Sequence, residues 1–193
     1  NLKVHIKAKF VGTKVDQLLL LDYGTLPPEQ VASLAGGDPQ AGPEWMRLTA
    51  TAIASRYAAD KDPAGVDVML DRALHEELVA ASRQEPFVAG YLGRQADVAN
   101  LRVLVRLRVL GETAGVREET WLPGGEVSFD VPMRLAGEDE ETVVSRFRLT
   151  AYSRLMEEGM AYARNNGSML RLERIGRELL LQYLLRARYI TFG

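Results

Sequence analysis

The segment "ANLRVLVRLRVLG" at residues 99–111 decides the fold, because it repeats the opening of the chain, "NLKVHIKAKFVG" at residues 1–12. Asn1 matches Asn100 and Gly12 matches Gly111, 99 positions later in each case. The basic residues between these ends also match: Lys3, Lys7 and Lys9 correspond to Arg102, Arg106 and Arg108. A basic and apolar segment that recurs at a constant distance indicates an internal repeat.

The secondary structure of this segment has two readings. Apolar residues alternate as in a strand at Leu101, Val103, Val105, Leu107 and Val109. A longer series at helical spacing comprises Val88, Leu92, Ala96, Ala99, Val103, Leu107 and Leu110. A strand that long is rare, Pro86 suits the first turn of a helix, and Gly111 suits its end. The pattern therefore predicts a helix over 86–110, with the apolar series as its buried face.

The same spacing predicts further helices over 43–60, 64–83, 138–165 and 168–188. Pro43 and Pro63 stand at helix starts, with Asp62 as a cap, and the four acids at 138–141 suit a first turn. No pair of segments has the turn residues of a hairpin. The sequence predicts an all-α fold.

Three further pairs of segments extend the repeat. "LDYGTL" at 21–26 matches "LPGGEV" at 122–127, "SLAGGD" at 33–38 matches "RLAGED" at 134–139, and "LDRALHEEL" at 70–78 matches "LERIGRELL" at 172–180. The offset grows only from 99 to 102, so each unit spans about a hundred residues. We expect a first helical repeat at 1–85 and a second at 86–193 that ends in the lead-in to a third. The chain is then expected to be part of a longer protein.

The composition excludes several classes of protein. The 193 residues carry 24 basic and 26 acidic side chains, whereas nucleic-acid binders usually have a basic excess. No cysteine is present, which excludes disulfides, a cysteine nucleophile and cysteine-ligated metal. No apolar run approaches the roughly 18 to 20 residues of a membrane span, and no signal peptide is visible.

A search for catalytic chemistry finds none. His5 and His75 have no carboxylate or cysteine at metal-ligand spacing, which favours a structural or surface role. Gly124-Gly125 lacks the Lys-Ser/Thr of a phosphate loop and reads as a turn. The acid pairs Glu118-Glu119 and Glu157-Glu158 point about 100° apart on a helix and read as solvated faces. We expect no catalytic, cofactor-binding or metal-binding residue.

The basic residues have two open interpretations. Lys3 and Lys7, like Arg102 and Arg106, are four apart and share one helix face. Either each row is a salt-bridged face against acidic helices of the neighbouring repeat, or it forms a rim that meets an acidic partner.

The residues resemble a known family. The motif Asp97-Val-Ala-Asn100-Leu-Arg102-x-x-x-Arg106-x-Arg108-x-x-Gly111, with "WLPGGEVS" at 121–128, is similar to the repeat motif of the C subunit of prokaryotic A/V-type ATP synthases. This subunit corresponds to the d subunit of the eukaryotic vacuolar ATPase. The opening segment resembles the first copy of the motif, and "LLQYLLRARYITFG" at 180–193 resembles the lead-in to the third. The first turn, "LLDYGTL", departs from the pattern because it lacks Pro-Gly-Gly.

The resemblance implies a fold and a role. Three helical repeats form a funnel with pseudo-threefold symmetry, of which this chain carries two, the first without its N-terminal helices. The funnel receives the central rotor stalk and sits on the membrane proteolipid ring, peripheral to the membrane on its cytoplasmic face. It couples stalk and ring in proton or sodium transport without being catalytic, and it binds no nucleic acid. A chain that lacks one repeat is expected to self-associate through the exposed faces of 86–110 or 168–188.

Two other classes remain as alternatives. A helical-repeat adaptor unrelated to a rotary motor is one, but a period of about a hundred residues is long beside the 20 to 45 of solenoid repeats. An α-helical enzyme is the other, and no constellation of acid, base or nucleophile supports it.

Overall fold

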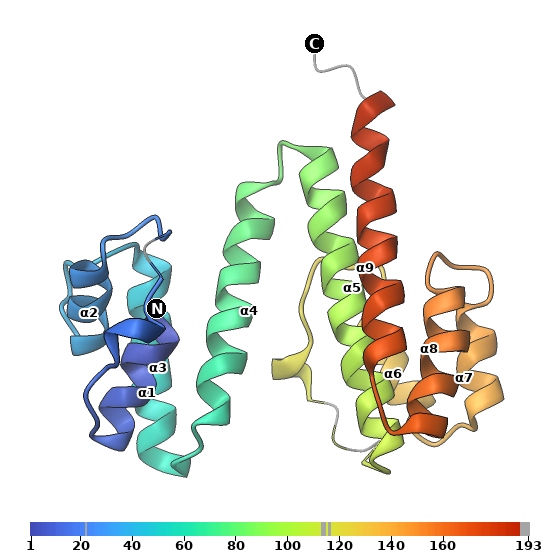
Figure 1. The fold of residues 1–193 in the computed structure, drawn as a ribbon, viewed down its shortest axis with the longest axis horizontal. Helices are drawn as coiled ribbons and strands as arrows, with labels where there is room; N and C mark the ends of the chain where they lie inside the picture. Colours follow the sequence, from blue (N-terminus) through green and yellow to red (C-terminus); the bar gives the residue numbers. More distant parts are fainter. Residues whose placement is uncertain (22, 113–114, 116, 190–193) are drawn as a thin grey trace. The chain divides into compact units, whose positions relative to one another are not determined.

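The computed structural model describes residues 1–21, 23–112, 115 and 117–189. Throughout these ranges the regular secondary structure is helical, which confirms the predicted all-α class. The chain divides into two compact units, Asn1–Glu77 and Leu78–Gly193. Figure 1 labels the helices of both units, and each unit is described by itself below.

The first unit is built around a small apolar core. Its helices are α1 (Leu2–Val11), α2 (Pro28–Gly36), α3 (Glu44–Asp60) and most of α4 (Ala64–Ala81), with a short 3-10 turn at Gln17–Leu19. The buried core residues come from α1, α3 and α4 and are Ile6, Ile53, Val66 and Leu70. The close stacking of Phe10 on Tyr57, with ring centroids 3.9 Å apart, adds a second contact between α1 and α3.

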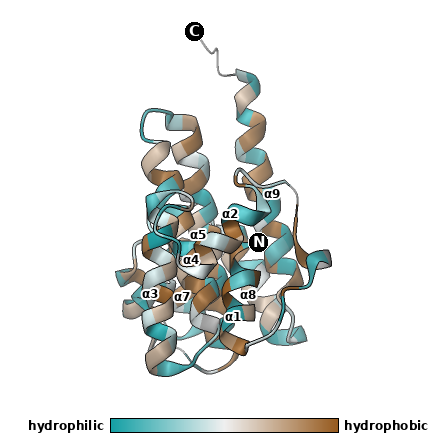
Figure 2. Ribbon diagram, turned by 90° about the vertical axis from the view of Figure 1, so that its left-hand side faces the viewer, coloured by the Kyte–Doolittle hydropathy of each residue, from teal (hydrophilic) through white to brown (hydrophobic). Residues whose placement is uncertain are grey.

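The second unit has the larger core. Its helices are α5 (Pro86–Val109), α6 (Asp130–Leu135), α7 (Glu140–Phe147), α8 (Ser153–Asn166) and α9 (Leu170–Leu185), with 3-10 turns at Glu118–Thr120 and Arg186–Tyr189. Residues from all five helices meet in one cluster, whose most deeply buried members include Leu101, Val105, Val143, Leu155, Met156 and Leu172. Figure 2 shows apolar and polar residues on the same helices, as expected for helices that bury one side.

Several helix ends follow the local signals in the sequence. Pro86 occupies the first turn of α5, and Gly167 ends α8 with φ of +61°, a conformation that favours glycine. The acidic run at 138–141 does begin a helix: the Asp139 side chain accepts a hydrogen bond from the Thr142 N–H at 2.7 Å, and Glu140 starts α7. The helix predicted at 64–83 ends earlier, at Ala81. The helix predicted at 168–188 ends at Leu185 and continues as a 3-10 turn.

The single helix predicted over 138–165 is wrong, because the structure breaks it between Phe147 and Ser153. At the break the Thr150 hydroxyl donates to the Phe147 carbonyl and accepts from the Tyr152 N–H, so a side chain replaces part of the helical hydrogen-bond ladder. Leu149 in this break is 99% exposed, whereas Tyr152 turns into the core. The apolar series of the sequence continues across the break and therefore hides it.

The predicted buried face of α5 is correct in the middle of the helix and wrong at both ends. Leu92 and Ala96 are buried as expected, whereas Val88 and Leu110 are 45% and 59% exposed. The residues that enter the core in the last turns are Asn100, Leu101, Leu104 and Val105. The buried face thus includes the polar Asp97 and Asn100, which an apolar pattern cannot reveal.

Candidate functional site

In the second unit, several side-chain hydrogen bonds hold the loop at residues 121–128, "WLPGGEVS". The Asn100 side chain donates to the Leu122 carbonyl at 2.9 Å and accepts from the Leu122 N–H at 2.8 Å. The Trp121 indole N–H donates to the Val127 carbonyl at 3.0 Å, which closes the loop on itself. A loop without regular structure is therefore held in one conformation by side-chain hydrogen bonds.

Asp97 holds the other end of this loop. Its carboxylate is fully buried and accepts hydrogen bonds from the N–H groups of Glu126 and Val127, both at 2.9 Å, and from the Tyr152 hydroxyl at 2.5 Å. Burial first, and then the hydrogen bond to Asp97, raise the pKa of Tyr152 above its usual range. The three donors compensate for the removal of the carboxylate from water, which identifies Asp97 as a structural anchor of the loop.

The pair of hydrogen bonds between Asn100 and Leu122 has an equivalent in the first unit. The Asn1 side chain donates to the Leu21 carbonyl at 2.7 Å and accepts from the Leu21 N–H at 2.8 Å. Asn1 and Asn100 are matched positions of the two basic segments, and Leu21 and Leu122 begin the matched loops. Asp22, the residue after Leu21 in this turn, lies outside the described residues.

The third basic residue of each row also makes equivalent contacts. The Lys9 ammonium donates to the Ala35 and Gly36 carbonyls at the end of α2, at 3.0 and 3.2 Å. The Arg108 guanidinium donates to the Leu135 and Glu138 carbonyls at and beyond the end of α6, at 2.9 and 2.6 Å. A cation at a helix C-terminus satisfies free carbonyls and complements the helix dipole. Lys9 and Arg108 are therefore structural caps.

The other basic residues differ between the two rows. The Lys3 ammonium lies 2.6 Å from the carboxylate of Asp71, and the Lys7 ammonium lies 2.6 Å from that of Asp67. Both acids are on α4. Arg102 and Arg106 are exposed, and among the described residues neither forms a hydrogen bond or an ion pair. The salt-bridged interpretation therefore holds for the lysine row, with acids of the same unit and not of a neighbouring repeat. Arg102 and Arg106 are thus open to solvent, unlike Arg108.

The two histidines are buried to different extents. Burial lowers the pKa of His5, whose Nε2 has no hydrogen-bond partner in the part of the chain that the structure describes. His75 is 6% exposed. Within the described ranges no group of three or more histidine, cysteine or acidic side chains is arranged to hold a metal ion.

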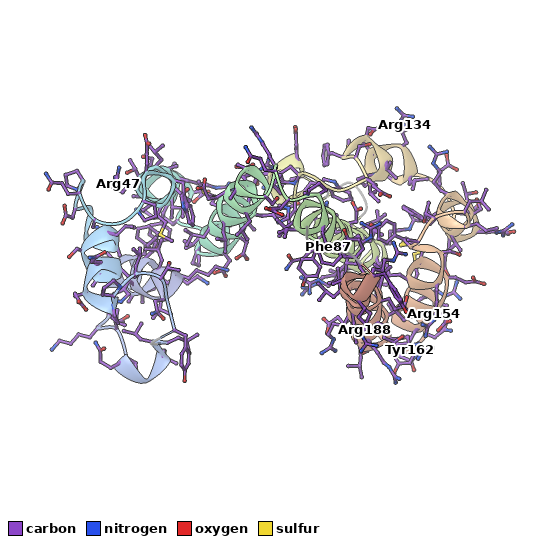
Figure 3. All side chains as sticks on the ribbon, turned by 90° about the horizontal axis from the view of Figure 1, so that it is seen from above. Arg47, Phe87, Arg134, Arg154, Tyr162 and Arg188 are labelled. Atoms are coloured by element: carbon purple, nitrogen blue, oxygen red, sulfur yellow. The ribbon has the colours of Figure 1, made fainter. Side chains whose placement is uncertain are left out.

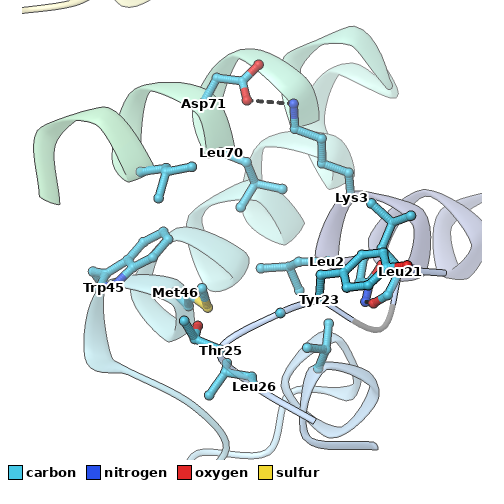
Figure 4. A pocket seen from close by; sticks show the side chains of 14 residues that line it. Leu2, Lys3, Leu21, Tyr23, Thr25, Leu26, Trp45, Met46, Leu70 and Asp71 are labelled. Carbon is cyan, nitrogen blue, oxygen red and sulfur yellow. Dashed lines mark hydrogen bonds and ion pairs between the residues drawn. The ribbon is translucent and has the colours of Figure 1, made fainter. Parts of the chain in front are cut away.

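An apolar cavity of about 330 Å³ lies in the first unit, at the edge of α1, α3 and α4. Its lining includes Leu2, Trp45, Met46 and Leu70, and the ion pair of Lys3 with Asp71 closes one side (Figure 4).

Glu158 on α8 and Glu178 on α9 each take part in two ion pairs. Arg154 on α8, labelled in Figure 3, bridges to Glu158 one turn along at 3.0 Å and to Glu178 on α9 at 2.9 Å. Glu158 also pairs with Arg171, and Glu178 with Arg174. These ion pairs connect α8 to α9.

Comparison of the chain with models of known families gives one result that covers its whole length. The profile of the ATP synthase (C/AC39) subunit family matches residues 1–193, so the chain belongs to this family of V/A-type ATP synthase subunits. Comparison with the curated proteins gives no match. None of the described helices is both long enough and apolar enough to cross a membrane.

Sequence reasoning assigned no role to the residues that organise the loop. Asp97 and Asn100 stood in the motif, but the apolar series of the sequence passes through neither position and so gave no sign that they are buried. Tyr152 gave no sign either, because its contact with Asp97 joins residues 55 positions apart.

Proposed function

We propose that the chain is a non-catalytic part of the central-stalk subunit that couples the rotor stalk to the membrane proteolipid ring of a V/A-type rotary ATPase. The observation that carries this proposal is the family match over residues 1–193. The subunit works in proton or sodium transport at the cytoplasmic face of the membrane, to which it is peripheral.

The equivalent contacts in the two units support a repeat architecture for this coupling subunit. The asparagine tie at Asn1 and Asn100 and the helix caps at Lys9 and Arg108 occur at matched positions. Residues 1–85 and 86–193 would then be two of three copies around a pseudo-threefold axis. A crystal structure in which these two segments fail to superpose would contradict this part of the proposal.

A passive role is supported by how the buried polar groups are used. Asp97, Asn100 and Tyr152 are engaged with one another or with the backbone of the loop. Groups held in this way stiffen a loop, and a part that transmits torque has to be stiff. We expect the purified chain to show no ATPase activity, and turnover that follows the polypeptide through purification would contradict a passive role.

The interactions with partners can be tested by co-purification. Full-length protein carrying an affinity tag should retain both the stalk subunits and the proteolipid ring from detergent-solubilised membranes. If neither partner is retained at low salt, the coupling role is wrong.

The isolated chain should also self-associate. Apolar residues are exposed on α5 and α9, with Val88 45% and Leu181 56% exposed. Light scattering at high protein concentration tests this, and a strictly monomeric species would contradict it.

A further inference from the structure

We infer that Arg102 and Arg106 form the docking site for an α-helix of a partner protein that presents two carboxylates one turn apart. This inference rests on the proposed function, because it assigns a surface of the chain to one of the partners of the coupling subunit.

The two arginines form a defined pair on the exposed side of α5. Asn100, Leu101, Leu104 and Val105 face the core, which leaves positions 102 and 106 on the outside. Their Cα atoms are one helical turn apart, about 6 Å along the axis. In the part of the chain that the structure describes, no acceptor binds either guanidinium.

The first unit shows what neutralises such a pair. Lys3 and Lys7 on α1 meet Asp71 and Asp67 on α4, which are themselves four residues apart. A basic pair at this spacing is thus matched by two carboxylates on one face of a helix.

The second unit lacks this internal partner. Displaced by the 102 residues that relate α4 to α9, Asp67 corresponds to Met169 and Asp71 to Glu173. Methionine carries no charge, and the described Glu173 makes no ion pair with Arg102 or Arg106. The substitution of an acid by Met169 therefore leaves the arginines available to an external carboxylate pair.

A protein helix fits this site better than other anionic partners. Val109 and Leu110, 39% and 59% exposed, continue beyond Arg106 at the end of α5 and give a docked helix apolar surface to cover. Two arginines are fewer than the four to eight basic residues that recognise anionic membranes, and the net charge of −2 disfavours nucleic acid. A second copy of the chain is also disfavoured, because its Asp67 and Asp71 are occupied by its own lysines.

The first test measures binding of a designed helical peptide with two glutamates four residues apart, compared with the same peptide carrying glutamines. Calorimetry at low salt should show that the glutamate peptide binds about tenfold more tightly, and 0.5 M salt should remove the difference, because exposed charges are screened. Arg102→Glu/Arg106→Glu should lose the preference. Arg146→Glu/Arg148→Glu, which changes the charge equally at two other exposed arginines, should keep it. Circular dichroism checks that all variants remain folded.

Equal binding of both peptides, or a preference that survives in Arg102→Glu/Arg106→Glu, overturns the inference. Binding of anionic vesicles through these arginines without binding of the glutamate peptide also overturns it, in favour of a membrane surface. In the co-purification assay, retention of stalk and ring by wild type but reduced retention by Arg102→Glu/Arg106→Glu supports the inference. Equal retention by both proteins contradicts the docking site alone, whereas no retention by wild type contradicts the proposed function.

Discussion

The Tyr152 hydroxyl donates a hydrogen bond of 2.5 Å to the carboxylate of Asp97, 55 residues earlier in the chain. Both side chains are buried, at 2% and 0% exposure. The contact joins the start of α8 to α5 and to the loop that Asp97 anchors. Tyr152 directly precedes α8, so this contact holds the start of that helix against α5.

Replacing Tyr152 with phenylalanine should destabilise the protein by about 1–3 kcal/mol, because Asp97 would lose one of its three donors while still buried. Urea unfolding measures the loss. Tyr162→Phe is the control: this tyrosine is 37% exposed, its hydroxyl has no described partner, and its substitution should cost less than about 0.5 kcal/mol. Equal effects of the two substitutions would show that the hydrogen bond to Asp97 is not important for stability.

Gly125 should not tolerate a side chain. A Cβ at this position would lie 2.0 Å from Oδ1 of Asp97, so either the loop or the anchor has to move. We expect Gly125→Ala to cost about 1–3 kcal/mol and to speed hydrogen exchange at the Glu126 and Val127 amides. Gly137→Ala, where nothing lies within 4 Å of the added carbon, provides the matched control. Unchanged exchange in Gly125→Ala would mean that the carboxylate does not hold the loop.

Protonation of Glu158 should lower the stability of the folded protein at acidic pH. Hydrogen bonds from Arg171, and then from Arg154, hold the pKa of this carboxyl below its usual range. A carboxyl with a lower pKa in the folded than in the unfolded state stabilises the fold above the unfolded pKa of about 4.3, and this contribution is lost as pH falls through the folded value. Urea midpoints between pH 6 and pH 3 should therefore decline less in Glu158→Gln than in wild type. Glu157→Gln, at an exposed neighbour without a described ion pair, should keep the wild-type decline.

The sequence was sufficient for the class of fold because helix boundaries depend on local chemistry. Pro86, Asp139 and Gly167 each satisfy or terminate backbone hydrogen bonds within a few residues, so their effect can be read without tertiary information. The break before Ser153 was not predictable from spacing, because the apolar series continues across it and the burial of Tyr152 involves Asp97, 55 residues away.

The candidate site was only partly predictable for a related reason. The repeat identified Asn100, Arg106 and Arg108 as matched positions, but it could not show which of their side chains form hydrogen bonds within the fold. Arg108 binds the end of α6, whereas Arg106, two residues earlier, is open to solvent. The difference depends on which elements pack beside each position, and a pattern of charges does not contain that information.

This difference within one row gives the last prediction. Arg108→Met should destabilise the second unit by about 1–2 kcal/mol, because the Leu135 and Glu138 carbonyls lose a charged donor while the apolar stem of the side chain is largely kept. Arg106→Met should change stability by less than about 0.5 kcal/mol, since no described group depends on it. For peptide binding the order should reverse, with Arg106→Met weakening the preference for glutamate and Arg108→Met leaving it intact. Thermal unfolding and calorimetry on the two variants separate the roles. If Arg106→Met proves as destabilising as Arg108→Met, both arginines serve the fold, and the open surface on α5 is not a docking site.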